Sequence, residues 1–232
     1  MDERAVRIKR FWEERGKRIE DPTIAARFRA DDRLEYDLQL ARNFCTPDSR
    51  VLDLGAGACG LSYYLAPFVR EIVAVDFVRE LLEKRALPPN IKTVVSDIRD
   101  FEIEDVFDLI LVYGVLNYVL DDDDVSRVYG NIHRMLAPDG VCVIKQQSGV
   151  WDTVPVDKFS EEFGTRYIAV YRHLDREIEL LKSLFDVEVL DVYPAHLNRW
   201  ENTHFYAYVC RQRAVVPAMA DSTPARDASL AA

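Results

Sequence analysis

Three aspartates and one glycine-rich segment have the residue types and spacing needed to hold a nucleoside. Asp53 lies just before the segment 55–60, Asp76 follows that segment by about twenty residues, and Asp97 lies further along the chain. Glycines let the backbone approach a ligand closely and leave N–H groups for an electron-rich or anionic group. A carboxylate such as that of Asp76 can accept hydrogen bonds from both hydroxyls of a ribose.

The glycine pattern separates several kinds of nucleotide-binding loop. A phosphate-binding P-loop needs lysine directly after its last glycine, whereas Leu61 follows Gly60 here, so that loop is excluded. The spacing Gly55-x-Gly57-x-x-Gly60 fits the dinucleotide pattern G-x-G-x-x-G, which leaves a nicotinamide cofactor open. Asp53 stands where that pattern normally has an apolar residue, and an acid there suits a cofactor that carries a cation.

Short apolar runs predict the strands that position these residues, and apolar positions at helical spacing predict the helices between them. Because ligands of open α/β sheets bind beyond the carboxyl ends of the strands, we expect the three aspartates to gather at one edge of the sheet. A turn is predicted at 137–140, and 151–171 is an aromatic insertion without a clear period. The predicted strands are 51–54, 72–75, 92–95, 107–112, 141–144, 187–193 and 205–210, and the predicted helices are 2–18, 31–44, 61–68, 78–84, 125–136 and 174–184.

The block Val51-Leu52-Asp53-Leu54-Gly55-Ala56-Gly57 resembles the first motif of class I S-adenosylmethionine-dependent methyltransferases. Asp97-Ile98 after the third predicted strand and the strand beginning Phe107-Asp108 also match motifs of that family. One position departs from it, because many members have a third glycine where this chain has Cys59. The resemblance runs from about residue 50 to residue 212 and makes S-adenosylmethionine the expected cofactor.

The resemblance implies an α/β fold, a Rossmann-like three-layer sandwich. Its seven-stranded sheet is expected to be mostly parallel with an antiparallel last strand, and N-terminal helices are added to it. The domain organisation expected is an N-terminal helical extension or lid over 1–46, a methyltransferase domain over 47–213 and a disordered tail over 214–232.

The resemblance also assigns roles to residues of the cofactor site. Asp53 and the glycine loop would hold the methionine part of the cofactor, Asp76 the ribose, and Asp97 the adenine amino group. Arg33 would meet the cofactor's carboxylate. The full set of expected cofactor residues is Arg33, Asp53, Gly55, Ala56, Gly57, Asp76, Phe77, Asp97, Ile98 and Tyr113.

Candidate catalytic residues lie after the fourth predicted strand and in the variable part of the chain. Asn117 and Tyr118 belong to the segment that faces the transferred methyl group in the family. A general base is useful when the acceptor is a hydroxyl that must lose its proton, and His173 and His196 are the candidates for it. The sequence leaves both O- and N-methylation open.

The composition limits the kinds of partner that we expect the protein to bind. The 232 residues carry 30 basic and 40 acidic side chains, a net charge of −10 that would repel a nucleic acid. No apolar run approaches the roughly 20 residues of a membrane helix, and the N-terminus lacks the apolar core of a signal peptide, so we expect a cytoplasmic protein without a membrane partner. The four cysteines lack ligand spacing, and the acidic run 121–124 is interpreted as a helix start, so no metal is expected.

The sequence therefore predicts a methyltransferase acting on O or N of a small polar metabolite, of the sugar or natural-product type, as a monomer or homodimer. It lacks the Asn/Asp-Pro-Pro-Tyr/Phe block of enzymes that methylate DNA amino groups. Two alternatives remain open at this point. One is an NAD(P)-dependent oxidoreductase with a Rossmann domain, and the other is a methyltransferase-like binding protein without catalysis.

Overall fold

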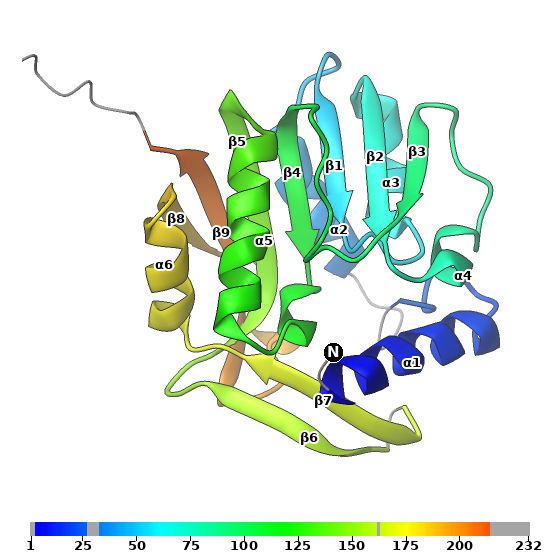
Figure 1. Ribbon diagram of the computed structural model, residues 1–232, viewed down its shortest axis with the longest axis vertical. Coiled ribbons are helices and arrows are strands. Elements are labelled where there is room, and N and C mark those ends of the chain that lie inside the picture. The colour runs from blue at the N-terminus through cyan, green and yellow to red at the C-terminus, as the bar shows by residue number, and fades with distance from the viewer. Residues whose placement is uncertain (1–2, 27–32, 162, 214–232) are drawn as a thin grey trace, which may run out of the picture.

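One seven-stranded sheet forms the centre of the protein. The computed structural model describes residues 3–26, 33–161 and 163–213. The strands of this part lie in the order β3-β2-β1-β4-β5-β9-β8 (Figure 1), and β9 runs antiparallel to both β5 and β8. This confirms the predicted fold class. The strand bounds are β1 Arg50–Leu54, β2 Glu71–Asp76, β3 Ile91–Val95, β4 Phe107–Tyr113, β5 Leu136–Gly149, β8 Phe185–Asp191 and β9 Thr203–Gln212.

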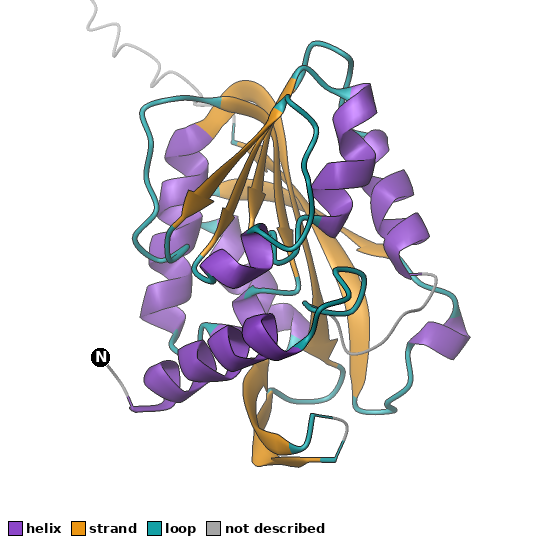
Figure 2. Ribbon diagram, turned by 90° about the vertical axis from the view of Figure 1, so that its right-hand side faces the viewer, coloured by secondary structure: helices purple, strands orange, loops and turns teal. Residues whose placement is uncertain are grey.

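Helices cover both faces of the sheet, as the edge-on view shows (Figure 2). Successive side chains of a strand point to opposite faces, so alternate residues enter different cores. Val51 packs with α2 (Arg33–Arg42) and α3 (Gly60–Leu65), whereas Leu52 and Leu54 pack with α5 (Asp122–Met135) and α6 (Leu174–Lys182). Continuous apolar runs in the strands therefore reflect burial on both faces.

The strand order creates a crevice between β1 and β4. The chain proceeds outward from β1 to β2 and β3, then returns to β4 on the other side of β1. Loops that leave neighbouring strands in opposite directions open a space beyond their carboxyl ends. This switch point determines where a ligand can lie.

Two further elements lie at the same end of the sheet (Figure 1). The helix α1 (Glu3–Arg18) packs against α4 (Arg79–Leu82) and β7, and its Phe11 ring lies 5.0 Å from that of Phe163. The sequence predicted no regular structure in 151–171, but β6 (Val154–Ser160) and β7 (Thr165–Tyr171) form an antiparallel hairpin there. Tyr167 of β7 and Phe163 of the connecting turn pack against Phe11 of α1, and this obscures the alternation of a half-exposed strand pair.

Some predicted boundaries differ from the structure. β5 already begins at Leu136 and continues to Gly149, because the predicted turn 137–140 is an irregularity in the pairing with β4 between Phe107 and Leu109. The predicted helix 61–68 becomes α3 followed by the 3-10 turn Ala66–Phe68, which contains a proline. Short 3-10 turns also occur at Leu116–Tyr118 (η2) and Ala195–Leu197 (η3).

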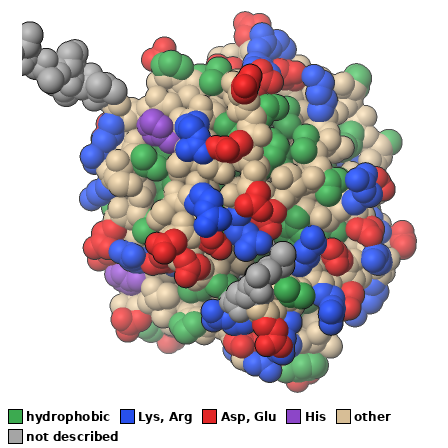
Figure 3. Space-filling view, in the orientation of Figure 1, with side chains coloured by type: hydrophobic (Ala, Val, Ile, Leu, Met, Phe, Trp, Pro, Cys, Tyr) green, Lys and Arg blue, Asp and Glu red, His purple; other side chains and the backbone are tan. Residues whose placement is uncertain are grey.

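Other expectations concern the helix starts, the surface and the termini. α5 begins at Asp122, with the Asp121 side chain accepting a hydrogen bond from the Asp123 backbone, as the acidic run predicted. Acidic and basic side chains alternate over the face in Figure 3. In the described ranges, every helix is too short or too polar to cross a bilayer. The predicted tail 214–232 lies outside the described residues.

Candidate active site

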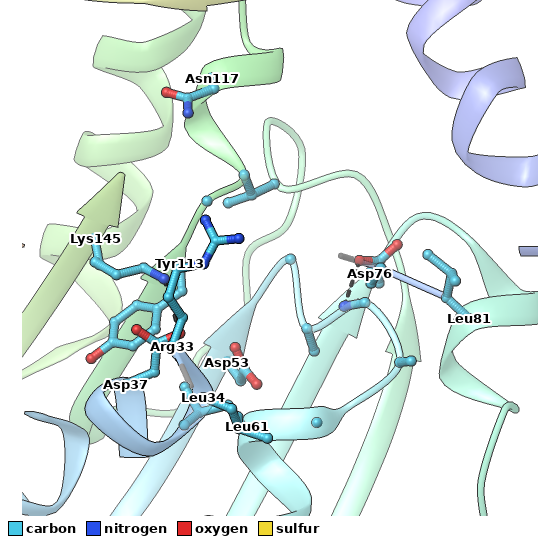
Figure 4. A pocket seen from close by; sticks show the side chains of 18 of the residues that line it. Arg33, Leu34, Asp37, Asp53, Leu61, Asp76, Leu81, Tyr113, Asn117 and Lys145 are labelled. Carbon is cyan, nitrogen blue, oxygen red and sulfur yellow. Dashed lines mark hydrogen bonds and ion pairs between the residues drawn. The ribbon is translucent and has the colours of Figure 1, made fainter. Parts of the chain in front are cut away.

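A cavity of about 220 Å³ lies at the switch point, beyond the carboxyl ends of the strands. Its wall includes the glycine loop and side chains from the ends of β1, β2, β4 and β5 (Figure 4). Further lining residues come from α1, α2, η2 and β7, which are far apart in the sequence. The cavity therefore combines one locally encoded loop with several distant elements.

The backbone of the glycine loop is bent by residues in the left-handed region. Gly57 has φ +54°, and a Cβ placed on it would lie 2.5 Å from the Cβ of Ala26. The buried Cys59 has φ +53°, a conformation that costs a non-glycine residue roughly 1–2 kcal/mol. The cysteine that replaces the family's usual glycine thus keeps a glycine-like backbone.

Asp76 joins the end of β2 to this loop. Its buried carboxylate accepts hydrogen bonds from the Gly57 backbone N–H at 2.8 Å and from the Val78 N–H at 2.9 Å. Burial raises the pKa of Asp76 to about 6, an effect that these backbone donors oppose. The carboxylate therefore lies ready at the cavity wall, directly beside the loop.

Asp53 points toward the α2 and α3 face of the sheet. The Ser62 hydroxyl of α3 donates a hydrogen bond of 2.5 Å to its carboxylate. Burial raises the pKa of Asp53 to about 6, and the nearby charge of Asp76 adds to this shift. Both aspartates are ionised at neutral pH and give this part of the cavity a negative character.

A buried polar network that the sequence did not predict lies beside Asp53. Lys145 Nζ donates to Asp37 Oδ2 at 2.9 Å and to the Tyr193 hydroxyl at 2.8 Å, and that hydroxyl donates to Asp37 Oδ1 at 2.5 Å. These residues come from β5, α2 and the loop after β8. Two signals could have indicated them: a lysine continuing the apolar strand 141–144, and an aspartate between the apolar positions of the helix 31–44.

Tyr113 ends β4 next to this network. The Lys145 ammonium lies 5.0 Å from the centre of its ring. Tyr113 lines the cavity, and its buried hydroxyl has no hydrogen-bond partner within the described part of the chain. Burial, with the charges of Asp37 and Asp53, raises the pKa of Tyr113 well above its usual value, so the hydroxyl stays a donor. An unpaired buried donor of this kind indicates a position where a ligand atom can accept.

Aromatic residues from α1, η2 and β7 form another part of the wall. The hydroxyl oxygens of Tyr118 and Tyr167 lie 3.2 Å apart, and those of Tyr167 and Tyr171 lie 3.3 Å apart. The Trp12 ring packs edge to face on Tyr118, with 5.2 Å between ring centres. We call Trp12, Tyr118, Tyr167 and Tyr171 the aromatic wall, because all of them line the cavity.

Most of the residues predicted for the site line this cavity. Figure 4 shows Arg33 of α2 above Asp53, near Tyr113, and Asn117 further out beyond the end of β4. The predicted residues among those that line it are Arg33, Asp53, Gly55, Ala56, Gly57, Asp76, Phe77, Tyr113, Asn117 and Tyr118.

Asp97 and Ile98, which are expected to meet the adenine, lie outside the wall of the cavity. The Asp97 carboxylate accepts two hydrogen bonds from the Arg99 guanidinium, at 2.9 and 2.6 Å, and one from the Arg99 backbone at 3.0 Å. The Ile98 side chain is buried in the core that contains Phe101. Their role toward adenine stays a prediction.

The two candidate histidines also lie away from the cavity wall. His173 caps α6: its Nδ1 accepts from the Asp175 N–H at 3.3 Å, and its Nε2 lies 3.2 Å from the Val150 carbonyl oxygen. His196 is exposed on η3. A base must come within hydrogen-bond reach of the proton that it removes, and neither residue is positioned along this cavity. Their catalytic role stays a prediction.

Comparison with known proteins finds a similar domain in the central part of the chain. Residues 52–144 match a family model described as "Methyltransferase domain". This stretch contains Asp53, the glycine loop, Asp76 and Asp97, and it forms the parallel part of the sheet, β3-β2-β1-β4-β5. This part of the chain is similar to a methyltransferase domain, which agrees with the resemblance noted in the sequence.

Two curated proteins are similar in sequence to parts of this chain. Nodulation protein S of Rhizobium tropici is 36% identical over 98 residues, which cover 40% of this chain and 41% of that protein. The dTDP-4-amino-2,3,4,6-tetradeoxy-D-glucose N,N-dimethyltransferase of Saccharopolyspora spinosa is 34% identical over 151 residues, or 62% of this chain and 55% of that enzyme. The matches thus span about half the length of these curated relatives.

A solved structure is similar in fold over nearly the whole chain. Phosphoethanolamine N-methyltransferase 1 of Haemonchus contortus, in complex with phosphoethanolamine and S-adenosylhomocysteine, superposes with a TM-score of 0.70 at 21% identity. The superposition covers 94% of this chain and 51% of that one. At this identity the comparison supports the fold alone.

Proposed function

We propose that this protein is an S-adenosylmethionine-dependent methyltransferase that transfers a methyl group to O or N of a small polar metabolite, of the sugar or natural-product type. The observation that carries the proposal is the cavity in which Asp53, Asp76 and the glycine loop meet at the carboxyl ends of β1 and β2. A family match over the same residues supports it.

The residues present fit the cofactor in charge and in hydrogen-bonding capacity. Asp76 would accept from the ribose hydroxyls, and Asp53 lies where the positively charged methionine portion would pass. Arg33 would receive the carboxylate. Phe77, Asp97 and Ile98 are proposed for the adenine. When bound, the cofactor supplies a methyl carbon attached to a positively charged sulfur, which is a good leaving group.

The protein's own task is then to align the acceptor and to exclude water. Correct positioning of two reactants can supply on the order of 7 to 11 kcal/mol of the barrier reduction. Asn117 and Tyr118 follow β4 along the cavity and are the residues proposed to hold the acceptor, whereas Tyr113, which ends β4, is proposed for the cofactor. The helix α1 contributes Trp12 to the same wall, in keeping with a lid function proposed for 1–46.

The names of the relatives agree with a small polar acceptor. One relative is named for methylating a dTDP-linked aminosugar, and the superposed structure holds phosphoethanolamine. The negative net charge does not suit a nucleic acid.

Separate calorimetric titrations of the purified protein with S-adenosylhomocysteine and with NADH test the proposal. We expect micromolar or tighter binding of the first ligand and no saturable binding of the second. Tight binding of NADH alone would contradict the proposal and favour an oxidoreductase. Transfer of labelled methyl from S-adenosylmethionine to a metabolite panel then separates an enzyme from a binding protein without catalysis.

A further inference from the structure

The aromatic wall is electron-rich and carries no formal charge. It offers rings and hydroxyl oxygens from Tyr118, Tyr167 and Tyr171, together with the Trp12 ring. Burial raises the pKa of all three tyrosines above the usual value, so their hydroxyls stay protonated at neutral pH. These groups can stabilise a positive charge through ring faces and oxygen lone pairs, but they do not remove protons.

Among the described residues, the charged side chains that line the cavity lie outside the aromatic wall. The acidic ones accept hydrogen bonds from neighbouring groups. Asp37 accepts from Lys145 and Tyr193, Asp53 accepts from Ser62, and Asp76 accepts from two backbone N–H groups. Arg15 lies near the aromatic wall but packs on Phe163, with 4.9 Å from its guanidinium carbon to the ring centre, and neither residue lines the cavity. The cavity thus has a charged part around Asp53 and an uncharged aromatic part.

We propose that the methyl acceptor is a primary or secondary amine whose nitrogen lies against the aromatic wall during transfer. This rests on the function proposed above. The lone pair of the neutral amine forms the new N–C bond, the C–S bond breaks, and its electron pair remains on sulfur. The positive charge passes from sulfur to nitrogen, and the nitrogen then releases a proton to solvent.

The aromatic wall suits the charges that arise when an amine is methylated better than those that arise when a hydroxyl is methylated. In amine methylation a positive charge is present before, during and after the transfer, so fixed aromatic rings and hydroxyl oxygens stabilise each stage. A hydroxyl must lose its proton as it attacks, and that reaction benefits from a base and a nearby cation. The residues of the aromatic wall contain neither, and the nearby Arg15, which acts electrostatically on Tyr118, donates to the Ala25 and Ile24 carbonyl oxygens and does not line the cavity.

A binding experiment tests the electrostatic part of the proposal without measuring turnover. The protein saturated with S-adenosylhomocysteine is titrated with choline and with its neutral isostere 3,3-dimethylbutan-1-ol, followed by tryptophan and tyrosine fluorescence. We expect choline to bind at least ten-fold more tightly. Equal affinity of the two probes would overturn the proposal.

Two variants of Tyr118 separate its ring from its hydroxyl. Tyr118→Phe keeps the ring and is expected to change the choline affinity less than three-fold, whereas Tyr118→Leu is expected to weaken it at least ten-fold. Melting temperature and affinity for S-adenosylhomocysteine are measured for both variants to show that the fold and the proposed cofactor site are intact. An equal effect of the two substitutions would contradict a role of the ring.

Matched acceptors test the chemistry itself. An aminosugar nucleotide is compared with its hydroxyl counterpart, and phosphoethanolamine with 2-hydroxyethyl phosphate, using labelled methyl and mass spectrometry of the products. We expect methylation of an amine at a rate at least 100-fold above that of the matched alcohol. Failure to bind S-adenosylhomocysteine would overturn the proposed function as a whole. Normal binding with methylation of alcohols alone would overturn only the amine assignment, and if no acceptor reacts, the comparison of choline with its isostere decides.

Discussion

The two parts of the cavity are built in different ways. The glycine loop and its two aspartates come from the short stretch 53–76, and the backbone of the loop holds Asp76 through the Gly57 N–H. The polar network of Asp37, Lys145 and Tyr193 joins residues separated by as many as 156 positions. The first part depends on local backbone geometry, whereas the second exists only when three distant elements dock together.

Breaking the long-range network should have the largest effect on stability. Lys145→Met removes the buried ammonium group that donates to Asp37, and we expect the free energy of unfolding to fall by about 3 to 5 kcal/mol in urea denaturation. The double variant Asp37→Asn with Lys145→Met should recover part of this loss. The exposed Lys182→Met serves as the control. A loss below about 1 kcal/mol for Lys145→Met would show that the network contributes little.

A second long-range pair makes stability depend on pH. The Tyr129 hydroxyl donates to the buried Glu177, whose other carboxylate oxygen has no partner in the described structure, and burial raises the pKa of Glu177 to about 8. The unfolded glutamate titrates near 4.3, so between these values the folded state holds one more proton. The free energy of unfolding therefore falls as the pH rises toward 8.

Glu177 accounts for most of this change between pH 6 and 8, whereas Asp53 and Asp76, with raised pKa values of about 6, complete their titration in the lower half of the window. Thermal and urea unfolding should show a loss of roughly 2 to 3 kcal/mol across this window. Glu177→Gln should remove most of the loss and be more stable than the parent protein at pH 8. An unchanged pH profile in the variant would exclude Glu177 as its cause.

The local part of the site should affect ligand binding more than stability. Asp76→Ala removes the proposed acceptor of two ribose hydroxyls, and we expect calorimetry to show an affinity for S-adenosylhomocysteine at least roughly thirty-fold lower, about 2 kcal/mol. Asp139→Ala, an exposed site in the first part of β5, provides the matched control. If both variants bind alike, the cofactor lies elsewhere.

The smallest effects should come from substituting two glycines whose φ angles are both positive. Gly57 and Gly164 have φ +54° and +64°, but only at Gly57 would a Cβ meet a neighbour within 4 Å. We expect Gly164→Ala to lower stability by about 1 kcal/mol without altering ligand binding. Gly57→Ala should cost more and weaken S-adenosylhomocysteine binding about ten-fold, since the loop must move. Equal melting temperatures and affinities would show that Ala26 yields freely.

The sequence predicted the central fold and the inner part of the cavity because both depend on short-range signals. Apolar runs followed by an acid indicate strand ends, and glycine spacing indicates a bend, so Asp53, Gly57 and Asp76 could be placed together before the structure was known. The hairpin β6–β7 was missed, since its aromatic residues follow contacts with α1 rather than a two-residue period.

The amino-acid order alone determined the strand succession, the glycine bend and the acids at the strand ends, because each follows from backbone geometry and neighbouring side chains. Only the tertiary structure decided that Lys145 meets Asp37 and Tyr193, that His173 caps a helix away from the cavity, and that Tyr118, Tyr167 and Tyr171 share one wall. Those contacts depend on how separate elements pack against one another, and spacing along the chain carries no record of that packing.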